Sequence, residues 1–379
     1  MPGPYKVIIM KMDQTTIFTT YFITFVNYHF PNSPDKFIIN PTIPGIMKTL
    51  KFLLIITAFF SLQFAQAQKS EYVVLKNIPL EGDMGWDYLL ADDATQRLYV
   101  SHGTMVQVLD LKTEKLVGTI PGTIGVHGIA IAKEFGKGFI TAGRLDSVVV
   151  FDLLTLQPTA KIKTDKNPDA ILYDPFSKRI FTFNGRGSSV TAIDAKTNEV
   201  VGTLAVSGKP EAAVSDGKGK IFVNIEDKST ITKFDAKTLK IEAEWPLDPG
   251  KEPSGLQIDL KTNRLFSACG ESKTIVVMDA VNGKIIASLP MGDGCDGLVF
   301  IKDDQNILAS CGEGVLTVVH QKNAKEYSVI QTLPTRRSAR TITYSEAEKK
   351  VYMSSADVTM ENNRRKVAPG SFQVVVVGK

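Results

Sequence analysis

The chain has 379 residues, of which 43% are hydrophobic, and its 44 basic and 40 acidic residues give a formal net charge of +4 at pH 7. Residues 1–67 hold five lysines and two aspartates, so 39 basic residues face 38 acidic ones in the rest of the chain. Because binding of nucleic acid usually needs a strongly basic face, this balance argues against a nucleic-acid partner.

The first 67 residues have the pattern of an export signal. Met47, Lys48 and Lys51 form a basic start, the apolar run FLLIITAFFSL follows, and AQA ends at Ala67 as a cleavage site of small residues. We therefore predict a signal peptide over 47–67, too short for a membrane span, and an exported protein, periplasmic or secreted. Residues 1–46 precede a signal that normally begins a protein, so we interpret them as an upstream, mis-started or disordered segment.

A five-residue phrase then recurs seven times along the chain. The copies are RLYVS from Arg97, GFITA from Gly138, RIFTF from Arg179, KIFVN from Lys220, RLFSA from Arg264, NILAS from Asn306 and KVYMS from Lys350. Their spacings are 40, 42, 41, 44, 42 and 44 residues. A fixed period near forty indicates one supersecondary unit stacked repeatedly.

Each unit contains four short strands. In the third copy we expect them at 170–173, 179–183, 190–193 and 200–204, because alternating apolar and polar residues there lie between turn-forming clusters. Four-stranded units of this period are blades of a β-propeller. We predict an all-β fold, a seven-bladed β-propeller of antiparallel blades that forms a single domain over 68–379.

The two ends of this domain predict how the ring closes. The last segment, SFQVVVVGK, matches the third strand of a blade and stops one strand short, whereas EYVVLKNIPL, from Glu71, matches a fourth strand. The N-terminal strand should therefore complete the last blade and remove the exposed edges that favour aggregation.

These repeats resemble the YVTN-repeat or YncE-like propellers. The resemblance lies in the phrases above, in third strands such as VQVLD and VVVFD, and in fourth strands such as KLVGTIPG, and it covers Glu71 to Lys379. It implies the propeller fold and leaves the function open, because propellers host many unrelated activities.

One position in the repeat points to a site. The residue that begins each first strand should lie at one mouth of the central channel. Aligning the repeats gives this position to Asp87, His127, Asp169, Glu211, Ser254, Asp296 and Arg340. Either these polar side chains only line a wet opening, or the converging carboxylates bind a cation or a protonated ligand.

A divalent metal, Ca²⁺ or Zn²⁺, is one possible ligand of this mouth. His102 ends the second strand of the first blade and His127 starts the next blade, so both should approach Asp87 and Asp169. Two imidazoles with carboxylates form a set that binds Zn²⁺ or a transition metal. Hydrogen bonding among the same four side chains is the other interpretation.

Further residues are expected on the same face. Trp86 could stack on a flat ligand or pack between blades. The last blade carries a long connection from Asp357 to Gly370 and the segment TRRSAR from Thr335, both expected at the mouth. Their cations would form a basic wall able to bind carboxylate, sulfate or phosphate, or would be solvated: Arg336, Arg337, Arg340, Arg364, Arg365 and Lys366.

The three cysteines should lie in one sector of the same face. Cys269 and Cys311 end neighbouring second strands, and Cys295 starts the first strand between them. A disulfide that includes Cys295 is one interpretation, and three buried small side chains are the other.

We therefore expect a monomeric, non-enzymatic binding scaffold for a small molecule, glycan or protein partner. The alternative is a metal-dependent hydrolase or lactonase, with Asp169 as base. Such an enzyme would resemble the gluconolactonase propellers, which have six blades and a Glu, Asn, Asn, Asp metal set. The matching residue types in this chain are Glu211, Asn184, Asn224 and Asp296.

Overall fold

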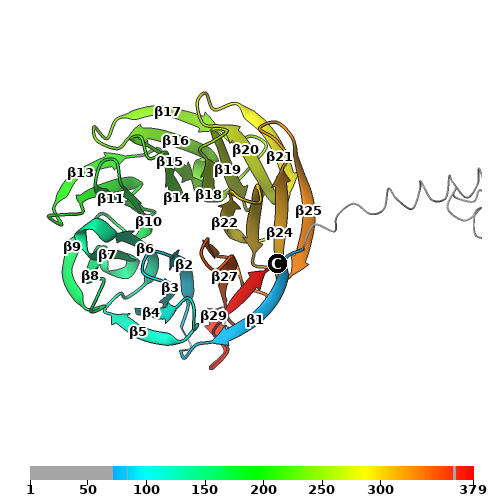
Figure 1. Cartoon of the computed structure of the whole chain (residues 1–379). Helices are drawn as coiled ribbons and strands as arrows, with labels where there is room; N and C mark the ends of the chain where they lie inside the picture. The colour runs from blue at the N-terminus through cyan, green and yellow to red at the C-terminus, as the bar shows by residue number, and fades with distance from the viewer. Residues whose placement is uncertain (1–70, 83, 362–363) are drawn as a thin grey trace, which may run out of the picture. The chain divides into compact units, whose positions relative to one another are not determined.

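The computed structural model describes residues 71–82, 84–361 and 364–379, without the side chains of residues 364 and 365. These residues form seven four-stranded antiparallel sheets and one two-stranded hairpin, with three short 3-10 turns, η1 (Lys133–Phe135), η2 (Gly143–Leu145) and η3 (Glu226–Lys228). The prediction of a seven-bladed β-propeller is confirmed (Figure 1). The segments predicted at 1–46 and 47–67 lie outside the described residues, among which no helix is long and apolar enough to cross a membrane.

The blades follow one another along the chain, and each begins at the central channel. Their first strands are β2 (Trp86–Asp92), β6 (Val126–Ala132), β10 (Pro168–Asp174), β14 (Pro210–Ser215), β18 (Pro253–Asp259), β22 (Cys295–Ile301) and β26 (Thr343–Ser345). Their second strands are β3 (Arg97–His102), β7 (Lys137–Ala142), β11 (Arg179–Asn184), β15 (Lys220–Ile225), β19 (Arg264–Cys269), β23 (Asn306–Cys311) and β27 (Lys350–Ser355).

The outer two strands of each blade complete the sheets. The third strands are β4 (Met105–Asp110), β8 (Ser147–Asp152), β12 (Ser189–Asp194), β16 (Thr230–Asp235), β20 (Thr274–Asp279), β24 (Val315–Gln321) and β30 (Gln373–Gly378). The fourth strands are β5 (Leu116–Pro121), β9 (Pro158–Lys163), β13 (Val200–Ala205), β17 (Ile241–Pro246), β21 (Ile285–Pro290), β25 (Tyr327–Pro334) and β1 (Val73–Pro79).

The recurring phrase is the second strand of each blade, and its residues are buried because both faces of a blade pack against neighbours. In β3, Leu98 and Val100 share a core cluster with Tyr352 and Val374 of the last blade. Tyr99, on the other face, packs with residues of the second blade, Val126 among them. Side chains of a strand alternate between its two faces, so each second strand supplies two interblade cores.

The ring closes as the sequence predicts. Strand β1 pairs antiparallel with β30, in a register that places Val73 opposite Gly378 and Pro79 opposite Gln373. Figure 1 shows this first strand, in blue, beside the red C-terminal strand. Leu80 extends the contact, because its backbone N–H donates to the carbonyl of Phe372 at 3.0 Å.

The long connection of the last blade contains a structure that the sequence analysis did not predict. We expected a loop from Asp357 to Gly370, whereas the segment includes an antiparallel hairpin of β28 (Val358–Glu361) and β29 (Arg364–Val367). The backbone N–H of Ala368 donates to the carbonyl of Asp357 at 2.8 Å and closes the base of the hairpin. Val367 also packs against the core between the first and last blades.

Candidate functional site

The predicted ring of side chains has the same place in every blade. Asp87, His127, Asp169, Glu211, Ser254 and Asp296 are each the second residue of a first strand. Each of these strands has a break in its pairing register next to that residue, and such a bulge re-aims a side chain. Arg340 lies three residues before the shorter strand β26. All seven residues line cavities at the channel mouth.

Three of these residues form the centre of the mouth. The Nδ1 atom of His127 lies 2.6 Å from Oδ2 of Asp87 and 3.4 Å from Oδ1 of Asp169. Burial alone would lower the pKa of His127, but the hydrogen bond to Asp87 and the negative charge of Asp169 raise it above its usual value. Two carboxylates from the neighbouring blades therefore favour the cationic form of this imidazole.

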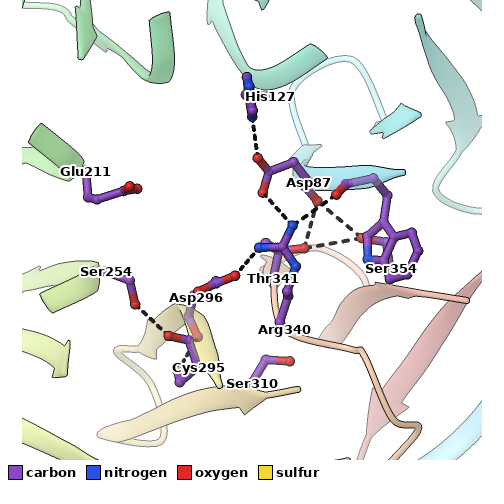
Figure 2. A network of polar contacts seen from close by, with 12 residues as sticks. Asp87, His127, Glu211, Ser254, Cys295, Asp296, Ser310, Arg340, Thr341 and Ser354 are labelled. Atoms are coloured by element: carbon purple, nitrogen blue, oxygen red, sulfur yellow. Dashed lines mark hydrogen bonds and ion pairs between the residues drawn. The ribbon is translucent and has the colours of Figure 1, made fainter. Parts of the chain in front are cut away.

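Arg340 joins the other side of the ring to this centre. Its guanidinium contacts Asp296, lies 3.6 Å from Oδ1 of Asp87, and donates to the carbonyl of Trp86 at 3.1 Å. Figure 2 shows Arg340 between the two aspartates. The backbone of Asp87 is also fixed, because its carbonyl accepts hydrogen bonds from Thr341 at 2.7 Å and Ser354 at 3.2 Å.

The opposite side of the mouth is acidic and partly buried. Burial and the charge of nearby Asp87 raise the pKa of Asp169 to about 6. Burial and the charge of Asp169 raise the pKa of Glu211 as well, although Lys209 lies 2.7 Å from Glu211 and also contacts Glu226. Ser254 differs from its neighbours, because its hydroxyl donates to the carbonyl of Cys295 at 2.6 Å and is used within the fold.

Two cavities open at the mouth and share Asp87, His127 and Arg340. The larger encloses about 630 Å³ and the smaller about 460 Å³. The charged residues that line only the larger one are Arg144, Asp146, Lys166 and Arg186. Those that line only the smaller one are Asp169, Lys209, Glu211, Glu226, Glu252, Glu271, Asp293 and Asp296.

The cations that line only the larger cavity were not among the predicted site residues, although a periodic signal marks two of them. Arg144 and Arg186 are each the second residue after a second strand. The same position in the seven blades holds, in order, Thr104, Arg144, Arg186, Asp227, Glu271, Glu313 and Asp357. This position is thus basic in blades two and three and acidic in blades four to seven.

Three of the four side chains in the predicted metal set lie together. Asp87, His127 and Asp169 offer ligand atoms that lie within 4.8 Å of one another. His102 is not in this group, because it follows Val100 on the face of β3 that packs against the last blade. Its ring is buried, stacks on Phe372 at 3.9 Å between centroids, and has Nδ1 3.1 Å from Oε1 of Gln107.

The residue types of the gluconolactonase set are present but do not meet. Asn184 and Asn224 are fully buried and line neither cavity at the mouth. The amide of Asn184 donates to Ser189 and Thr191, and the amide of Asn224 donates to the carbonyl of Ser254 at 3.0 Å. These amides stabilise strand contacts, so the four residues do not form one metal set at the mouth.

The basic wall predicted on the last blade is also wrong in part. Arg340 reaches the ring, whereas Arg336 forms an ion pair of 2.6 Å with Asp357 and lines neither cavity. Lys366 pairs with Glu361 across the hairpin at 2.7 Å. The side chains of Arg364 and Arg365 lie outside the described residues.

Trp86 and the cysteines have the structural roles that were offered as alternatives. Trp86 packs on Phe372, with 5.9 Å between ring centroids, and is half-buried at the wall of the larger cavity. Cys269, Cys295 and Cys311 are buried free thiols. Cys295 lies opposite Cys311 in the strand pair without a disulfide between them.

Comparison with known proteins agrees with this architecture. Residues 106–361 match the family model described as YNCE-like beta-propeller. A segment of 148 residues is 28% identical to the protein named Uncharacterized protein YncE from Salmonella typhi, and 27% identical to its namesake from Escherichia coli O157:H7. That segment is 36% of this chain and 41% of each of these proteins, so the match spans less than half of their length. The chain belongs to the YncE-like β-propeller family.

Proposed function

We propose that this propeller is an exported, monomeric binding protein that holds a polar small molecule or glycan at its channel mouth without transforming it. The observation that supports this function is the pair of adjoining cavities, whose lining includes a side chain from each of the seven first-strand positions. Cavities of a few hundred cubic ångströms with convergent polar groups are typical of ligand sites.

The free-energy cost of burying carboxyl groups at the mouth also favours a binding role. Asp169 and Glu211 are largely buried carboxyl groups, and burial raises the pKa of both. The charge of Asp87 adds to this effect at Asp169, and the charge of Asp169 adds to it at Glu211. Groups that the fold alone would disfavour are commonly retained because a ligand interacts with them. A ligand with hydrogen-bond donors or a positive charge would satisfy these carboxylates.

A metal ion is the second candidate ligand, favoured by the arrangement of Asp87, His127 and Asp169. With these three residues as ligands, a Zn²⁺ ion would keep a position open for water, and the metal-dependent hydrolase of the sequence analysis would become the function. A metal would have to replace the proton that His127 shares with Asp87, so metal binding should release protons.

The two candidates are separated by one set of measurements on full-length protein purified without a metal-binding tag. We expect elemental analysis to find no stoichiometric metal, and thermal shifts to respond to polar compounds but not to Ca²⁺, Zn²⁺ or chelator. Glu211→Gln should abolish the response to the best compound. Asp303→Asn makes a similar change at the far end of a blade, where Asp303 pairs with Lys349 at 2.8 Å, and should leave the response intact. Stoichiometric metal that is lost in Asp169→Ala would contradict the binding proposal and support the hydrolase.

A further inference from the structure

The two cavities at the mouth differ in the sign of their charge. Four cationic side chains and two carboxylates line the larger cavity. Eight carboxylates and two cationic side chains line the smaller cavity. Because Asp87, His127 and Arg340 belong to both linings, the two cavities adjoin one another.

Two of the cations in the larger cavity are not used by the fold. Lys166 is neutralised by Asp146, whose oxygen lies 2.8 Å from its Nζ, and Arg340 contacts Asp87 and Asp296. By contrast, no hydrogen bond or ion pair of the Arg144 or Arg186 side chain occurs within the described part of the chain, and both residues are exposed.

Asp146 is not available to neutralise Arg144. Its carboxylate binds Lys166 and accepts the backbone N–H of Asn167 at 3.0 Å, and these contacts lower the pKa of Asp146 to about 2. The positive charge of the two guanidinium groups therefore remains for a ligand. Guanidinium groups bind planar carboxylates and phosphates through paired hydrogen bonds.

We propose that the ligand of this mouth is a small zwitterion, with an oxyanion held by Arg144 and Arg186 and an ammonium group held among the carboxylates around Asp169 and Glu211. This inference rests on the proposed binding function and specifies its ligand class. The second residue after each second strand supports this inference. It is Arg only in blades two and three, whereas in blade five it is Glu271, which lines the acidic cavity. The two ends of one ligand would thus be recognised by different blades.

The test is isothermal titration of the full-length protein with three matched probes, aminocaproate, caproate and hexylamine. We expect the affinity for aminocaproate to be at least about ten-fold higher than for either singly charged probe, because aminocaproate alone fills both subsites. Aminohexyl phosphate should replace aminocaproate with similar or higher affinity, and the tighter of the two identifies the preferred oxyanion. Equal affinities for the three probes, or no binding of any probe by the wild-type protein, would overturn the inference.

Variants assign the two ends of the ligand. Arg144→Gln combined with Arg186→Gln should weaken aminocaproate and caproate binding about ten-fold or more and leave hexylamine binding unchanged. Arg337→Gln, the removal of an exposed arginine that lines neither cavity, is the matched control and should change none of the affinities. If the double variant binds caproate normally while Glu211→Gln weakens hexylamine, the mouth is a binding site and the zwitterion inference fails.

Discussion

At the scale of single residues, the mouth brings several carboxylates close together, and their mutual repulsion and burial lower the stability of the folded protein. Asp169 has its pKa raised to about 6 by burial and by nearby Asp87, so its ionised form is less favourable in the folded protein than in the unfolded chain. Asp146, on the same face, is the opposite case, since Lys166 and a backbone N–H lower its pKa to about 2. The two aspartates therefore predict opposite effects of neutralisation.

Asp169→Asn should stabilise the protein at pH 8 by about 1–3 kcal/mol. The substitution removes a carboxylate whose ionised form is disfavoured by burial and by the charge of Asp87. A raised carboxyl pKa destabilises the folded state above that pKa and has no effect below the unfolded value near 4, so the gain should shrink as pH falls from about 6 to about 4. Urea unfolding of the wild-type protein and of the Asp169→Asn variant, at pH values from 8 to about 4, measures this gain in stability. Asp146→Asn should destabilise at pH 8, and that loss should fade only at lower pH. A destabilised Asp169→Asn variant at pH 8 would contradict this account.

At the scale of elements, the strands and the residues of the channel mouth were predictable because every repeat folds into a blade of the same geometry. Alternation placed the four strands of the third blade to within two residues, and alignment brought His127 and Asp169 to one position that the structure confirms. His102 was misplaced because the sequence does not show which face of β3 points to which neighbour. The alignment also contained the signal of Arg144 and Arg186, but their lack of partners depends on three-dimensional contacts.

Deletion of strand β1 tests whether closure of the ring is needed for folding. Deleting Glu71 to Leu80 exposes the edge of β30 and removes Tyr72 and Leu80 from two interblade cores. We expect this protein to aggregate or to lose cooperative unfolding, because every blade depends on its neighbours for a buried face. Deleting residues 1–67 is the control and should leave the melting curve unchanged. Calorimetry and size-exclusion chromatography report both results, and a folded, monomeric product of the first deletion would show that closure is dispensable.

At the scale of the whole molecule, the closed ring is what makes a site out of distant residues. Trp86 and Arg340 are 254 positions apart in the chain and share a hydrogen bond of 3.1 Å. The sequence predicted that these blades meet, since the repeat number and the two ends imply closure. It did not predict the division of the mouth into a basic and an acidic cavity, because that division depends on which charges pair with each other, such as Lys166 with Asp146.

The most direct test of this convergence is the pKa of His127, measured by NMR titration and assigned by comparison with a His127→Gln variant. Asp169 raises the pKa of this imidazole and Arg340 lowers it, although one lies 42 and the other 213 positions further along the chain. We predict that Asp169→Asn lowers the pKa of His127, that Arg340→Gln raises it, and that Asp303→Asn, at the far end of a blade, leaves it unchanged. A pKa of His127 that neither of the first two substitutions moves would contradict the convergence of these side chains at one mouth of the ring.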